Sequence, residues 1–172
     1  LEALVRREGG LPTARVLRIL CQIALGLEEA HASGVIHRDL KPNNVLVNTA
    51  GEPSLLDFGI AKLIVEAEED VDTQTALTRL NGRGYTLGYC APEQITGEAT
   101  SVAVDVFSIG VMLFETLTGS LPFKNEGGRA AIEHAIIHTD APSISKALEA
   151  NRINALRPID ANNARGDLEA IV

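Results

Sequence analysis

The sequence predicts a mainly α-helical fold that carries one short β-hairpin. Apolar residues recur at helical spacing through residues 12–33. A second and more apolar stretch at residues 102–118 is followed by Gly119, a residue that commonly ends a helix. Between these two stretches, short apolar runs flank the turn-rich residues 48–53, which is typical of a hairpin.

The remaining elements follow from the same patterns. The two hairpin strands are expected at residues 45–47 and 54–56. A weaker helical pattern covers residues 129–137, whereas residues 139–163 are expected to be irregular. A further helix is expected to begin within residues 167–172.

Composition argues against several classes of function. The chain has 172 residues, 45% of them hydrophobic, which is enough for a core. A net charge of −8 and the absence of Trp argue against a nucleic-acid partner. The two cysteines have neither disulfide nor metal spacing, which favours a reducing cytoplasmic setting. The apolar residues 102–117 include two acidic side chains and fall short of the ~20 residues of a membrane span, so no membrane segment is expected.

Polar residues gather in three short motifs that together suggest phosphoryl transfer. This reaction needs a group that orients the attacking hydroxyl, positive charge beside the phosphate, and oxygen ligands for Mg²⁺. Asp39 can accept the proton, and Lys41 can supply the charge. Asn44 and Asp57 offer hard oxygen ligands, and antiparallel pairing in the hairpin is expected to bring them to one metal ion. The motifs are His37-Arg38-Asp39-Leu40-Lys41-Pro42-Asn43-Asn44, Asp57-Phe58-Gly59 and Ala91-Pro92-Glu93.

These motifs, in this order, resemble the C-terminal lobe of a eukaryotic-like (Hanks-type) serine/threonine protein kinase of the bacterial kind. The resemblance implies the C-lobe of the α+β protein kinase-like fold and transfer of the ATP γ-phosphate to Ser or Thr hydroxyls of proteins. Asp39 and Lys41 would be catalytic, and the cofactors would be ATP and Mg²⁺, with Mn²⁺ as an alternative metal. Cofactor binding would involve Lys41, Asn43, Asn44, Leu46 and Asp57, with Asn44 and Asp57 as the metal ligands.

The resemblance also assigns structural and regulatory roles. His37 and Phe58 would be packing residues, and Asp105 would anchor the backbone of the catalytic loop. Arg38 would pair with a phosphate on the activation segment, residues 57–93. The candidate acceptors and platform residues in that segment are Thr73, Thr75, Thr78, Thr86 and Glu93.

The resemblance covers residues 1–172 as a partial kinase domain. The glycine-rich loop, the strand Lys and the helix Glu of a kinase N-lobe do not precede His37, so the chain is expected to be a piece of a longer protein and to be inactive alone. The full-length protein is expected in the cytoplasm, with a membrane anchor left open. His31, His134 and His138 have no partner spacing and are expected at the surface or at helix ends.

Two other interpretations remain open. The chain could be a catalytically silent, kinase-like binding or scaffold module, although such relatives typically lose one of the residues that correspond to Asp39, Asn44 and Asp57. It could also be a gene fragment that folds poorly, because the absent lobe would leave apolar surface exposed.

Overall fold

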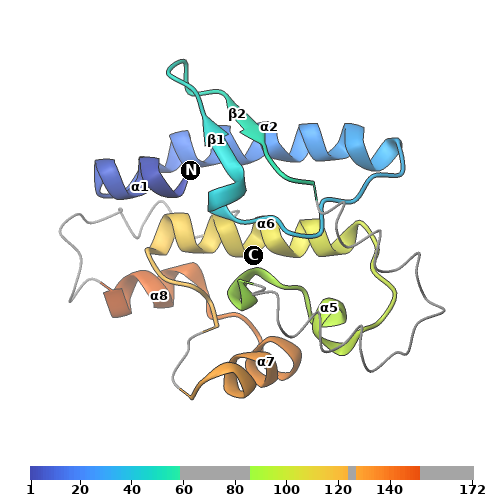
Figure 1. Ribbon diagram of the computed structural model, residues 1–172. Coiled ribbons are helices and arrows are strands. Elements are labelled where there is room, and N and C mark those ends of the chain that lie inside the picture. The colour runs from blue at the N-terminus through green and yellow to red at the C-terminus, as the bar shows by residue number, and fades with distance from the viewer. Residues whose placement is uncertain (59–85, 124–126, 152–172) are drawn as a thin grey trace.

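The computed structural model of the chain describes residues 1–58, 86–123 and 127–151 (Figure 1). This part is mainly helical, with a two-stranded antiparallel sheet, as the sequence predicts. The elements are α1 (Glu2–Glu8), α2 (Thr13–Ala32), the 3₁₀ turn η1 (Pro42–Asn44), β1 (Val45–Val47), β2 (Pro53–Leu55), the 3₁₀ turn η2 (Leu87–Tyr89), α5 (Pro92–Thr96), α6 (Ala103–Thr118), α7 (Arg129–His138) and α8 (Ile144–Asn151).

Helix α6 is the central element of the molecule. It runs between α2 on one side and α7 and α8 on the other (Figure 1), and it contacts α2, α8 and η2. Most of its side chains are buried, including Met112 and Phe114. The helix ends at Gly119, whose φ of 76° lies in the left-handed region that glycine adopts without strain.

Helix α2 is amphipathic and packs along α6. The buried residues of α2 share one face because they recur every three or four positions. They are Val16, Ile19, Leu20, Ile23 and Leu27. The same face joins the core formed by Val111, Phe114 and Leu117 of α6.

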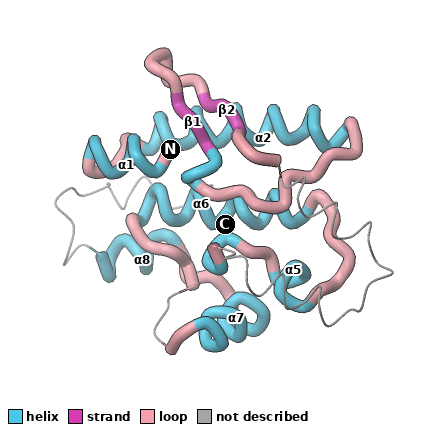
Figure 2. The backbone as a smooth tube through the Cα atoms, viewed as in Figure 1, coloured by secondary structure: helices cyan, strands magenta, loops and turns pink. Residues whose placement is uncertain are grey.

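The second strand of the hairpin lies one residue earlier than expected, whereas β1 has its predicted bounds. Val45 pairs with Leu55 and Val47 with Pro53, so β2 ends one residue earlier than predicted. Leu56 still belongs to the ladder by its backbone, because its N–H donates to the Asn44 carbonyl at 2.8 Å. The two strands project away from α6 beside α2 (Figure 2).

Helix α8 corrects the expectation that residues 139–163 are irregular. Its N-terminus is capped by Ser143 Oγ, which accepts the Lys146 N–H at 3.3 Å. Ile144 and Leu148 lie one turn apart and are buried against α6. Two large apolar residues in two turns give a weak sequence signal, so the packing on α6, rather than propensity, stabilises this helix.

Helix α7 ends one residue beyond the range predicted for it. Residues 62–88 have no sustained periodicity and are expected to form a loop; their first part, residues 62–85, lies outside the described residues, and the 3₁₀ turn η2 begins at Leu87. The expected helix at residues 167–172 also lies outside the described residues. Among the helices that the structure describes, none combines the length and the apolar character that crossing a bilayer requires.

Candidate active site

The segment between α2 and β1 places a cation and an amide on one carboxylate. Lys41 Nζ lies 2.9 Å from Asp39 Oδ2. Asn44 Nδ2 donates to the same oxygen at 3.2 Å and to the Asp39 carbonyl at 2.8 Å. No described residue donates to Asp39 Oδ1, so the carboxylate is held by one oxygen while the other can accept a proton. Lys41 is largely buried and Asp39 is about one third exposed, which leaves the group accessible.

Asp105 on α6 holds the backbone that leads into this carboxylate. Its side chain is completely buried and accepts three hydrogen bonds. The N–H groups of His37 and Arg38 donate to its two oxygens, each at 2.8 Å, and His31 Nε2 lies 2.8 Å from Oδ2. A buried carboxylate is costly unless it is hydrogen-bonded, and here both oxygens are satisfied. Arg38 has a φ of 64°, a left-handed conformation that is costly for a residue with a side chain.

His37 links the loop to the hairpin. Its ring is buried, and Nε2 lies 3.0 Å from the Leu56 carbonyl oxygen, which can only accept a hydrogen bond. Nδ1 lies 3.3 Å from the N–H of Asp39, which can only donate. The two contacts together select the tautomer that carries its proton on Nε2. The ring also contacts Phe58, with centroids 4.8 Å apart.

The hairpin brings the backbones of the two predicted metal ligands to the same end. Asn44 immediately precedes β1, and its carbonyl accepts the N–H of Leu56. Asp57 is the next residue after Leu56. Asp57 is exposed and has a φ of 53°. In the described part of the chain, no hydrogen bond joins the two side chains. Asn44 uses its amide nitrogen on Asp39, and its carbonyl oxygen accepts no bond from a described residue.

The other predicted cofactor-binding residues lie on the outer side of the hairpin or next to it. Leu46 is 56% exposed in β1, which is unusual for a large apolar side chain. Asn43 in η1 is exposed as well. Both side chains are therefore accessible to a ligand.

Residues 86–91, directly before α5, form a platform that is hydrogen-bonded to α6. Ser108 Oγ donates to the Tyr89 carbonyl at 2.9 Å, and the Tyr89 hydroxyl donates to Glu115 Oε2 at 2.5 Å. Burial and this hydrogen bond to a carboxylate raise the pKa of Tyr89 above its ordinary value. Thr86 is exposed and Glu93 is half-buried. The candidate acceptors Thr73, Thr75 and Thr78 lie outside the described residues.

Two polar residues at this site were missed by the sequence reasoning. The expectation that His31 lacks a partner is wrong, because its ring reaches Asp105 across 74 positions of sequence. No local pattern signals a contact of this range. The second residue is Gln94, at the third position of α5. Gln at this position often bonds the backbone of the capping residue, so the sequence did contain a signal for this contact.

The other two histidines also have a partner. His134 and His138 lie one turn apart on α7, and their ring centroids are 4.6 Å apart. Both are exposed, as the sequence analysis expects, but the expectation that they have no partner spacing is wrong.

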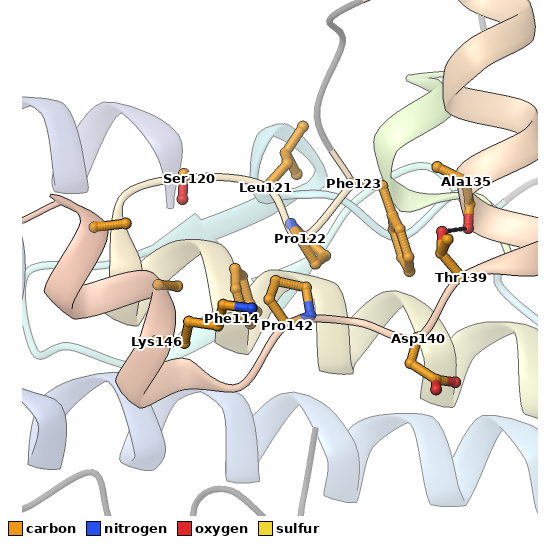
Figure 3. A pocket seen from close by; sticks show the side chains of 12 residues that line it. Phe114, Ser120, Leu121, Pro122, Phe123, Ala135, Thr139, Asp140, Pro142 and Lys146 are labelled. Atoms are coloured by element: carbon orange, nitrogen blue, oxygen red, sulfur yellow. Dashed lines mark hydrogen bonds between the residues drawn. The ribbon is translucent and has the colours of Figure 1, made fainter.

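A cavity of about 340 Å³ lies away from these residues, between the C-terminal end of α6, α7 and α8 (Figure 3). Phe114, Leu121, Pro122 and Phe123 give it a largely apolar wall. Lys146 and Asp140 also line it. No residue of the catalytic-loop motif lines this cavity, so it is separate from the candidate active site.

A loop with a carboxylate, a lysine and an asparagine, anchored by a buried aspartate, is the catalytic arrangement of protein kinases. Residues 1–162 match the family described as the protein kinase domain, and the chain belongs to this family. The family as a whole uses ATP and a divalent metal to phosphorylate proteins.

Curated relatives of the chain include bacterial serine/threonine-protein kinases. A probable serine/threonine-protein kinase PknB of Lactococcus lactis subsp. lactis is 35% identical over 100% of this chain and 27% of its own length. The serine/threonine-protein kinase pkn3 of Myxococcus xanthus is 35% identical over 99% of this chain and 34% of its own length. PknA of Mycobacterium tuberculosis is 37% identical over 83% of this chain and 30% of its own length. The chain thus spans about a quarter to a third of these relatives.

Proposed function

We propose that the protein containing this chain is a serine/threonine protein kinase, and that residues 1–172 form the C-terminal lobe of its catalytic domain. The convergence of Lys41 and Asn44 on one oxygen of Asp39 is the observation that carries this proposal. It leaves the other carboxylate oxygen for the substrate. The activation segment would be residues 57–93, and the rest of the ATP site would be supplied by an N-terminal lobe.

In this proposal, Asp39 orients the Ser or Thr hydroxyl of the substrate protein. As the hydroxyl oxygen bonds to the γ-phosphorus of ATP, the bond to the β-phosphate oxygen breaks, ADP leaves, and the hydroxyl proton passes to Asp39. Lys41, beside Asp39, neutralises charge on the transferred group. Leu46 and Asn43 would contact the nucleotide from the accessible face of the hairpin.

Asn44 and Asp57 would hold the divalent metal. Their oxygens are the hard ligands that Mg²⁺ prefers, and Mn²⁺ accepts the same set. The Asn44 carbonyl oxygen is available because the amide nitrogen takes the contact with Asp39. A bound metal supplies charge neutralisation for the phosphates.

The remaining residues would serve regulation and assembly. Arg38 would pair with a phosphorylated Thr75 or Thr78, and Thr86 would bond near Asp39. Glu93 would pair with an arginine later in the domain. We place the protein in the cytoplasm, with a membrane anchor left open for the full-length chain.

The test is Asp39→Asn in the full-length protein. Phosphate transfer to a protein substrate should fall by about 10²-fold or more, whereas nucleotide affinity should stay within about threefold. The same change at the exposed Asp140 is the control and should leave transfer unchanged. Transfer that persists in Asp39→Asn would exclude this mechanism. A wild-type protein that binds nucleotide without transferring phosphate would favour the alternative, a catalytically silent scaffold.

A further inference from the structure

The side chain of Gln94 bridges two segments that are far apart in sequence. Gln94 lies in the first turn of α5 and is half-buried. Its Oε1 accepts the N–H of Ala91 at 3.1 Å, and its Nε2 donates to the carbonyl of Arg38 at 3.0 Å. The second contact spans 56 positions and joins the platform to the residue directly before Asp39.

Both ends of this bridge are themselves fixed. The N–H of Arg38 is bonded to the buried Asp105, so Arg38 is held from α6 at its nitrogen and from α5 at its carbonyl. Ala91 is completely buried, and it closely follows Tyr89, whose carbonyl is bonded to Ser108. A shift of the Gln94 side chain would therefore move one well-anchored segment relative to another.

The space beside the bridge is nearly filled. Gln94, Arg38, Asp39, Thr86 and Tyr89 line a cavity of only about 10 Å³. A cavity of that size holds one water molecule at most. The contact between Gln94 and the Arg38 carbonyl is therefore direct, with room for at most one water molecule beside it.

The chemistry of the bridge requires an amide of this length. One end must accept from an N–H and the other must donate to a carbonyl. Glutamate keeps the acceptor but places an oxygen against the Arg38 carbonyl, whereas asparagine is one methylene shorter.

We propose that Gln94 is a positioning residue that sets the register between the substrate platform and the Asp39 carboxylate. This inference rests on the proposed kinase function. A residue in this role affects where the hydroxyl of the protein substrate lies relative to Asp39. Small displacements of reacting groups lower the reaction rate strongly. It has no contact that would affect nucleotide binding among the residues that the structure describes.

The test uses Gln94→Glu and Gln94→Ala in the full-length protein, with kcat and KM measured separately for a peptide substrate and for ATP. Gln94→Glu should lower kcat/KM for the peptide by about tenfold or more, and KM for ATP should stay within about twofold. The control is Glu28→Gln on α2, the reverse exchange of carboxylate and amide at an exposed side chain. The control should match the wild type. Unchanged peptide kinetics in Gln94→Glu would overturn the proposal, and so would an equal rise in KM for both substrates.

Hydrogen exchange gives a measurement that does not depend on activity. Gln94→Ala should speed exchange at the Ala91 amide by about tenfold, whereas Gln94→Glu retains the acceptor and should preserve its protection. Exchange in α2 should not change in either variant. Unchanged protection of Ala91 in Gln94→Ala would overturn the bridge itself. If the wild type transfers no phosphate but this pattern appears, the proposed function fails while the bridge stands.

Discussion

At the residue scale, Tyr89 shows how a buried hydroxyl ties the platform to α6. Its side chain is buried, its hydroxyl donates to Glu115, and its carbonyl accepts from Ser108. Both partners lie on α6, about two turns apart. One residue thus fixes the platform through its side chain and through its backbone.

Removal of the hydroxyl should make stability less sensitive to alkali. Tyr89→Phe should cost about 1 kcal/mol of the free energy of unfolding at neutral pH, because it removes one buried hydrogen bond. Folding raises the pKa of Tyr89, so above its ordinary value of about 10 the unfolded chain loses this proton while the folded protein retains it. Wild-type stability therefore falls as the pH rises through that range.

The variant lacks this loss, so its deficit should shrink above about pH 10. Denaturant unfolding of both proteins at pH 7 and near pH 10.5 measures the difference. A deficit that stays constant or grows with pH would contradict the raised pKa.

At this site, the proximity of residues that are close in sequence follows from local structure. Asp39, Lys41 and Asn44 lie within six positions, so their clustering follows from a short loop and a single turn. The contacts of Asp105 with His31 and of Gln94 with Arg38 span 74 and 56 positions. Such contacts depend on how α6 and α5 dock, which no periodicity specifies.

At the scale of elements, α8 shows packing that overrides a weak local pattern. The helix begins after Pro142 and is capped by Ser143, and Ile144 is only 1% exposed. Sequence reasoning found the long helices α2 and α6 because their apolar faces repeat over several turns. It missed α8 because two turns offer few repeats, and because its apolar face is satisfied by α6.

Truncation of the Ile144 side chain, which packs on α6, should lower the stability of the protein substantially. Ile144→Ala should lower the free energy of unfolding by about 2–5 kcal/mol, since it leaves a cavity against α6. The control, Lys146→Ala, truncates an exposed side chain on the same helix and should change it by about 0.5 kcal/mol or less. Denaturant unfolding monitored by circular dichroism distinguishes the two. Equal effects would mean that α8 is not docked as described.

At the scale of the whole molecule, the ends of the hairpin and the catalytic loop meet at one place. The Leu56 N–H is bonded to the Asn44 carbonyl, and the Leu56 carbonyl accepts from His37. This arrangement places Asn44 beside Asp39 and the start of the Asp57 motif beside His37. Composition alone could not specify that the two hairpin ends meet, whereas the hairpin pattern in the sequence predicted it.

Asn44 should therefore affect the requirement for metal. In the full-length protein, Asn44→Ala should raise the Mg²⁺ concentration for half-maximal phosphate transfer by about tenfold, in addition to lowering kcat. The control is Asn48→Ala in the hairpin turn, where the side chain bonds only Glu52 among the described residues. It should leave the Mg²⁺ dependence unchanged. A variant at Asn44 with the wild-type Mg²⁺ dependence would exclude it as a metal ligand.

Three side chains of α6 hold both functional segments of the chain. Asp105 is hydrogen-bonded to the loop before Asp39, and Ser108 and Glu115 are hydrogen-bonded to Tyr89 in the segment before α5. Because all three contacts start from one helix, a change that frays α6 should loosen both segments together, whereas loss of a single side chain, as in Tyr89→Phe, releases only its own contact.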